Sequence, residues 1–199
     1  MNMKILAISD THGDSNLVKK IGEIAKKEKV DLILHAGDVT WFGEETKGII
    51  KPLTDKGEVL IVHGNHEDIE TINHLSEVYP TLKNLHKTGI ERNEIGFFGS
   101  GTTDWGFKED SENLFNELKE AHSKIKHLKK KIMISHSPPT GSVLELMGFP
   151  GSYGVTKAIK KFKPDFVICG HIHEGGGLIE EIEGSKVINA SRVPIIFEI

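Results

Sequence analysis

Cysteine is nearly missing from this sequence. Cys169 is the only one among 199 residues, so an internal disulfide and a thiolate-rich zinc site are both excluded. The residue lies in an apolar run, and we interpret it as a small side chain packed inside a strand. Any metal site is therefore expected to use oxygen and nitrogen ligands.

Long apolar runs, an excess of positive charge and a P-loop are missing too. The longest apolar runs are strand-sized, well short of the ~20 residues that span a bilayer. With no secretory-leader pattern at the start, we expect a cytoplasmic protein without a membrane partner. The formal charge of −4 does not indicate a nucleic-acid partner, and no Gly-Lys-Ser/Thr follows the glycines of residues 99–106. Whether the chain forms a homo-oligomer stays open.

Short apolar runs typical of strands alternate with helical patterns along most of the chain. Strands are predicted at 4–9, 32–36, 59–63, 132–135 and 165–169, and helices at about 15–29, 111–128 and 155–162. A short helix is expected to end before Pro52, Asp110 to cap the helix that starts at 111, and a hairpin to turn near Arg92 and Asn93. One terminal meander is predicted from β segments at 178–183, 186–190 and 194–199. We infer a single domain over residues 1–199, with an α/β (α+β) fold of mixed sheets covered by helices.

Polar side chains follow five of the predicted strands at the point where each strand ends. These residues are Asp10 and His12, Asp38, Asn65 and His66, His136, and His171 and His173. In open α/β sheets ligands bind at this carboxyl edge. An extended segment would present His171 and His173 together, because side chains two apart in a strand face the same way.

Seven of these side chains are typical metal ligands: Asp10, His12, Asp38, Asn65, His136, His171 and His173. Seven oxygen and nitrogen ligands are too many for one tetrahedral zinc and suit two five- or six-coordinate ions that share one ligand. Asp38 is the expected bridge, because its two oxygens can hold cations ~3.5–4 Å apart. Such a pair would supply a bridging hydroxide for in-line attack at phosphorus. His66 would donate to a phosphoryl oxygen or protonate the leaving group.

Each of these residues alone is more often a turn aspartate, a helix cap or a core histidine, so the prediction depends on the joint pattern. The other histidines are interpreted as core or surface residues, with a hydrogen bond to the site as an alternative for His35 and His63. Candidate substrate-binding residues are Asn65, His66, Trp41 and Trp105, although Trp41 could instead pack on the next helix. Residues 140–154 form a candidate substrate lid.

In their order, these motifs resemble the motif set of calcineurin-like metallophosphoesterases. The resemblance runs from about residue 3 to residue 173 and is carried by Asp10-Thr11-His12, Gly37-Asp38, Gly64-Asn65-His66-Glu67, His136 and Gly170-His171-Ile172-His173. It implies a four-layer αββα sandwich of two mixed β-sheets flanked by helices. By position, the first metal would be held by Asp10, His12 and His173, and the second by Asn65, His136 and His171. Asp38 would bridge the two ions, and His66 would be the catalytic histidine.

The expected function is therefore a binuclear, metal-dependent hydrolase of small phosphate esters, with phosphodiesters favoured over phosphomonoesters. The resemblance implies two divalent ions. Manganese is expected first, with Fe, Ni, Zn or Co as alternatives that the ligand set does not separate. The alternative function is a metal-binding scaffold of the same fold without significant hydrolysis. Nucleic-acid processing would need a basic groove, which the charge balance does not indicate.

Overall fold

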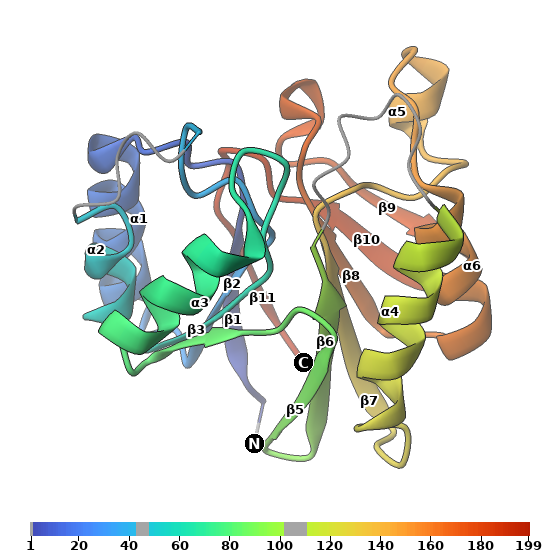
Figure 1. The fold of residues 1–199 in the computed structure, drawn as a ribbon, viewed down its shortest axis with the longest axis horizontal. Coiled ribbons are helices and arrows are strands. Elements are labelled where there is room, and N and C mark those ends of the chain that lie inside the picture. Colours follow the sequence, from blue (N-terminus) through green and yellow to red (C-terminus); the bar gives the residue numbers. More distant parts are fainter. Residues whose placement is uncertain (1, 43–47, 102–110) are drawn as a thin grey trace.

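The computed structural model describes residues 2–42, 48–101 and 111–199. Two β-sheets lie against each other, with helices on the outer side of each (Figure 1). The five-stranded sheet has the order β11-β1-β2-β3-β4 and consists of β1 (Lys4–Ile8), β2 (Leu32–His35), β3 (Glu58–Ile61), β4 (Leu82–Asn84) and β11 (Ile195–Glu198). The six-stranded sheet has the order β5-β6-β7-β8-β10-β9 and consists of β5 (Thr88–Arg92), β6 (Ile95–Ser100), β7 (Lys130–Ser135), β8 (Phe166–Cys169), β9 (Ile179–Ile182) and β10 (Ser185–Asn189).

Helices cover both outer faces. The five-stranded sheet is covered by α1 (Ser15–Glu28), α2 (Lys51–Thr54) and α3 (Ile69–Val78), and the six-stranded sheet by α4 (Ser111–Ser123) and α6 (Tyr153–Phe162) (Figure 1). Two short elements lie near the strand ends, α5 (Val143–Leu146) and the 3₁₀ helix η1 (His173–Gly175). The predicted sandwich of two mixed sheets flanked by helices is confirmed.

The core consists of three apolar layers, because alternate residues of a strand face opposite sides of its sheet. In β1, Ile5 and Ala7 pack between the two sheets, whereas Leu6 and Ile8 face the helices. A third layer lies between the six-stranded sheet and α4 with α6. Among the described residues, no helix has both the length and the apolar character needed to cross a membrane.

Local sequence signals explain several elements. Asp14 caps α1, where its carboxylate accepts the backbone N–H groups of Asn16 and Leu17. The hairpin predicted near Arg92 is confirmed, with β5 and β6 antiparallel and joined at Asn93 and Glu94. Both turn residues have positive φ angles, which suits a tight two-residue hairpin turn.

Three sequence-based predictions about elements are wrong. The terminal segments do not form one meander, because β9 and β10 pair with each other whereas β11 joins the other sheet, antiparallel to β1. Pro52 lies inside the first turn of α2 rather than after a helix, a position where its missing N–H costs no helical hydrogen bond. Residues 43–47, part of the stretch where the short helix was predicted, lie outside the described residues. The helix that starts at Ser111 ends at Ser123 instead of near residue 128. Asp110, its predicted cap, lies outside the described residues.

Candidate metal centre

The carboxyl ends of parallel strands from both sheets meet at one edge of the sandwich. β1, β2 and β3 run parallel in one sheet, and β7 and β8 run parallel in the other. Four residues that follow these strands have positive φ angles of 44° to 70°, namely Asp10, His12, Asp38 and His171. Side-chain-bearing residues avoid this left-handed region, and such strained backbone concentrates at functional sites.

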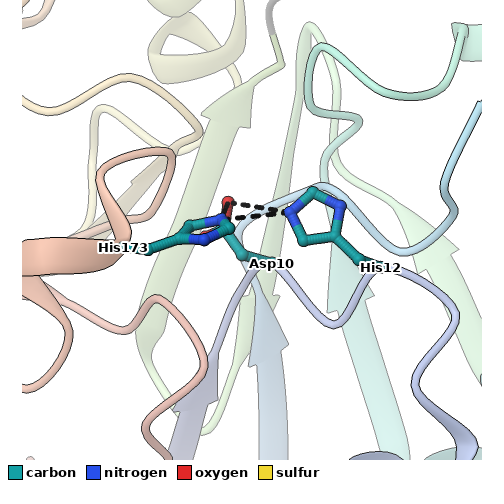
Figure 2. Close-up of side chains that lie close together, drawn as sticks. All are labelled: Asp10, His12 and His173. Carbon is teal, nitrogen blue, oxygen red and sulfur yellow. Dashed lines mark hydrogen bonds and ion pairs between the residues drawn. The ribbon is translucent and has the colours of Figure 1, made fainter.

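Asp10, His12 and His173 form the first cluster of candidate ligands, and Figure 2 shows the three side chains turned toward one another. His173 Nε2 lies 3.4 Å from Asp10 Oδ1 and 3.1 Å from His12 Nε2. His12 Nδ1 lies 3.4 Å from the carbonyl oxygen of Thr40, to which it can only donate. The lone pair of His12 Nε2 therefore faces the cluster.

Asp38 lies at the centre of a second group of side chains. Its Oδ2 atom is 3.7 Å from His12 Nε2, 3.8 Å from His66 Nε2 and 3.4 Å from His136 Nε2. Its Oδ1 atom accepts the backbone N–H groups of Asn65 and His66 at 2.8 and 2.9 Å. One carboxylate thus contacts the groups that follow β1, β3 and β7, which is the position that a bridging ligand needs.

Asn65 and His136 meet beside Asp38. His136 Nε2 lies 2.9 Å from Asn65 Oδ1, and His136 Nδ1 donates to the carbonyl oxygen of Ala36 at 2.8 Å. In the neutral imidazole this tautomer leaves Nε2 as the ligand atom. The ring of His171 lies 5.1 Å from that of His136, but His171 belongs to none of the three Asp/His groups whose ligand atoms lie within 4.8 Å of one another among the described residues.

The expectation that an extended segment presents His171 and His173 is wrong. β8 ends at Cys169, His171 has a left-handed backbone, and His173 begins η1. The chain turns here because the backbone N–H of His171 donates to the Asp10 carboxylate at 3.0 Å. A turn therefore brings His173 to Asp10 and leaves His171 beside His136.

The electrostatics of the cluster favour bound cations. Burial raises the pKa of Asp10, but the hydrogen bond from His173 and the charge of His136 outweigh it and lower the pKa to about 2. Burial also opposes ionisation of Asp38, yet His136 holds the pKa of Asp38 well below its usual range. For His136 burial lowers the pKa, but the negative charge of Asp38 raises it to about 10. In the metal-free protein a proton on His136 thus balances charge that a metal ion would otherwise balance.

The spacing of the donor atoms fits metal coordination. Metal–ligand bonds of ~2.0–2.2 Å place neighbouring donor atoms about 3–3.5 Å apart in tetrahedral or octahedral geometry. The Nε2 atoms of His12 and His173 lie 3.1 Å apart, and the Nε2 and carboxylate oxygen pairs of the two clusters lie 3.4 to 3.9 Å apart, at this spacing or slightly above it. Nitrogen and oxygen donors without sulfur suit Mn, Fe, Zn and similar ions. The residues present therefore fit divalent metals, without separating one element from another.

Glu67 supports this site, and its role was not deduced from the sequence. Its buried carboxylate accepts the backbone N–H groups of Asp38 and Gly64, both at 2.8 Å, and that of Thr40 at 3.1 Å. Burial and the charge of Asp38 raise the pKa of Glu67 to about 7 despite these donors. Glu67 thus joins the loop that carries Asp38 to the loop that carries Asn65. The only hint in the sequence was that Glu67 belongs to the motif of residues 64–67.

Ser191 and Arg192 were also missed. Ser191 Oγ donates to Asp10 Oδ2 at 2.8 Å, and Arg192 contacts the backbone oxygen of Asp10 at 3.4 Å and Asp14 at 3.1 Å. Both lie between β10 and β11, 181 and 182 residues from Asp10, so no local pattern could have indicated the contact. This segment fixes the orientation of the Asp10 carboxylate.

Glycines allow the loops to approach this closely. A Cβ atom at Gly64 would overlap the Asp38 carboxylate, and one at Gly170 would overlap Ser9 Oγ and crowd Asp10.

His35, the histidine at the end of β2, supports the same loops through hydrogen bonds. His35 Nδ1 accepts the Gly37 N–H and its Nε2 donates to Thr11 Oγ1, both at 3.2 Å. The hydrogen-bonding alternative for His35 therefore matches the structure.

The candidate substrate-binding residues lie in different places. The ring of Trp41 is 5.1 Å from that of His12 and 4.6 Å from that of His66, so Trp41 borders the cluster. Trp105 lies outside the described residues. The candidate lid, residues 140–154, carries α5, whose Leu146 is 88% exposed. A cavity of about 260 Å³ lies between α5 and residues 174–178.

Comparisons with known proteins identify relatives of this chain. A model of the calcineurin-like phosphoesterase family matches residues 3–175. The UPF0046 protein K07C11.7 of Caenorhabditis elegans is 25% identical over 213 residues, which cover 96% of this chain and 70% of that protein.

Two solved structures show the same fold. The protein TT1561 of Thermus thermophilus superposes with a TM-score of 0.78 at 21% identity, over 97% of this chain and 91% of that one. A structure described as a novel archaeal phosphodiesterase superposes with a TM-score of 0.52 at 21% identity, over 94% and 82% of the two chains. At this identity the likeness concerns the fold alone.

Proposed function

The chain belongs to the calcineurin-like phosphoesterase family, and from that membership we propose that it is a metal-dependent hydrolase that favours phosphodiesters over phosphomonoesters. The observation that carries the proposal is the convergence of Asp10, Asp38 and four histidines at the strand ends of both sheets. Nitrogen and oxygen donors gathered from distant parts of the chain serve no evident packing purpose.

In this proposal, two divalent ions bind at the cluster. Asp38 would be shared between the two ions, Asp10, His12 and His173 would hold one, and Asn65, His136 and His171 would hold the other. When bound, such a pair lowers the pKa of water and stabilises negative charge on phosphoryl oxygens. Manganese is our first choice of metal, with Fe, Ni, Zn or Co as alternatives.

His66 is the proposed catalytic histidine. It follows Asn65 directly, and its backbone N–H donates to Asp38 Oδ1, which orients the loop toward the cluster. Its Nε2 atom lies 3.8 Å from Asp38 Oδ2, so the imidazole faces the cluster. In this position His66 donates a proton to a phosphoryl oxygen or to the leaving group, a contribution typically worth about 10²–10⁴-fold in rate.

A small phosphate ester is the proposed substrate class, bound by Asn65 and His66 with Trp41 at the border of the site. The preference for diesters is part of the proposal, and the experiment below tests it by comparing a diester with a monoester. A cytoplasmic location also stays a prediction. The alternative is a scaffold of the same fold that binds metal but does not catalyse hydrolysis. The following experiment separates the two functions.

The experiment measures hydrolysis of an aryl phosphodiester and the matching monoester by the metal-loaded protein. Activity is expected to disappear with a chelator and to return with Mn²⁺ or Ni²⁺. His66→Ala is expected to lower kcat by about 10²–10⁴-fold while metal content is retained. His74→Ala, an exposed histidine on α3, is the matched control. No hydrolysis of mono-, di- or cyclic esters with metal supplied would leave the scaffold function. An unchanged rate in His66→Ala with full metal content would remove His66 from the mechanism.

A further inference from the structure

Two exposed aromatic side chains lie at the edge of the Asp/His cluster. Trp41 and Phe42 follow Asp38 in the loop after β2 and are 48% and 52% exposed. The ring of His66 lies 4.6 Å from that of Trp41 and 4.5 Å from that of Phe42. We name Trp41 and Phe42 the aromatic shelf. The shelf thus presents apolar surface to solvent directly beside the proposed catalytic histidine.

The backbone of the shelf is strained. Phe42 has a φ angle of 53°, in the left-handed region that bulky side chains avoid. A glycine would adopt this conformation without strain, so the turn alone gives no reason for a phenylalanine. Strained conformations of this kind concentrate where a side chain serves binding or catalysis. The backbone therefore holds the ring of Phe42 beside His66 at an energetic cost.

A phosphate group by itself gains nothing from such a surface. Metal ions and polar side chains bind its charged oxygens, whereas apolar walls at a ligand site bind the organic part of the ligand. Diesters and monoesters differ in one organic part, the substituent that stays on phosphorus after hydrolysis. An enzyme that favours diesters needs a surface for that substituent.

We propose that the aromatic shelf binds a planar aromatic ring on the retained substituent of a phosphodiester. This inference rests on the proposed function and names a substrate class for it. Hydrolysis adds water across the bond between phosphorus and the leaving group, which departs as an alcohol or phenol, and the product is a monoester that still carries the ring. Stacking of a ring on an exposed aromatic side chain changes affinity by roughly 5- to 150-fold.

Two substrates with the same leaving group isolate this effect. Phenyl p-nitrophenyl phosphate and ethyl p-nitrophenyl phosphate both release p-nitrophenol and differ only in the retained substituent. With the metal-loaded protein, kcat/KM for each ester is corrected for its uncatalysed rate. The value for the phenyl ester is expected to exceed that for the ethyl ester by roughly 5- to 150-fold. Trp41→Ala and Phe42→Gly are expected to remove most of this preference, and Trp41→Phe to keep most of it.

Control measurements separate the loss of ring binding from a loss of stability of the fold. Phe42→Gly is expected to keep or raise the melting temperature, since glycine accepts the backbone angle. Val78→Ala removes a side chain of equal exposure at the end of α3 and is expected to leave the preference unchanged.

Two results would contradict the proposal that the aromatic shelf binds a ring of the substrate, while leaving the proposed function in place. One is metal-dependent hydrolysis of both esters by the wild type without a preference for the phenyl ester. The other is an equal loss on both esters in Trp41→Ala and Phe42→Gly, which would mean that the rings only support His66. If the metal-loaded protein hydrolysed neither ester, both the proposed function and the proposed role of the aromatic shelf would be contradicted.

Discussion

Substitution of Glu67 gives the most specific prediction about how the two ligand loops are held together. Its carboxylate is the acceptor for three backbone N–H groups, those of Asp38, Thr40 and Gly64. Glu67→Ala leaves these buried donors without an acceptor and separates two loops that carry proposed ligands. Glu67→Gln keeps the shape and one acceptor oxygen. The structure therefore predicts a graded loss, with alanine worse than glutamine.

The magnitude follows from the number of donors. A buried N–H left without an acceptor costs about 1–3 kcal/mol, so Glu67→Ala should lower the free energy of unfolding by at least about 3 kcal/mol. For a chain of this size each kcal/mol lowers the melting temperature by about 2–4 °C, so the decrease should be at least about 6–12 °C. Glu67→Gln, with its amide nitrogen in the position of Oε2, leaves only the Thr40 N–H without an acceptor and should lose about 1–3 kcal/mol.

The assay is thermal unfolding of the metal-free protein, combined with a metal titration of each variant. Metal affinity should fall in the same order, because supporting groups of metal ligands typically contribute about 10–100-fold to affinity. Glu77→Ala, at an exposed position of α3, is the control for loss of a carboxylate. If Glu67→Ala melted and bound metal like the wild type, the two loops would not depend on this carboxylate, and the reasoning would be refuted.

Two further predictions concern the support of Asp10 and the protonation of His136. Ser191→Ala removes the hydrogen bond to Asp10 and should weaken metal binding about 10–100-fold in a titration, whereas Ser76→Ala on α3 should not; equal affinities would contradict the role of Ser191. The pKa of His136, raised to about 10, gives a pH prediction with a definite sign. The proton on His136 contributes to the free energy of unfolding of the metal-free protein. This contribution is complete below about pH 6.5, the ordinary pKa of histidine, and is lost as the pH rises through about 10. Because the same proton competes with metal, affinity should increase with pH over this range, and affinity independent of pH would contradict it.

The sequence predicted the strands that carry the site, because their apolar runs are continuous and a polar residue follows each run. It did not predict which sheet the last strand joins. Residues 195–198 are typical of a strand in any context, and only the packing of Ile195 and Phe197 against the inter-sheet core places β11 beside β1. β4 was missed because three residues are too few for a periodic pattern.

For the site, residue types and spacing indicated the ligand candidates but not the shape of the backbone. His171 and His173 were expected on an extended segment, whereas the hydrogen bond from the His171 backbone to Asp10 turns the chain. Ser191 could not be found because its contact joins opposite ends of the sequence. Glu67 lay in a visible motif, but its role depends on donors from a different loop.

Anomalous X-ray scattering from crystals grown with Mn²⁺ tests the central claim most directly, since it locates the ions among the side chains. Two neighbouring peaks are expected with Asp38 between them, one among Asp10, His12 and His173 and the other beside Asn65, His136 and His171. Crystals saturated with Mn²⁺ that showed no peak within bonding distance of Asp38 would contradict the account.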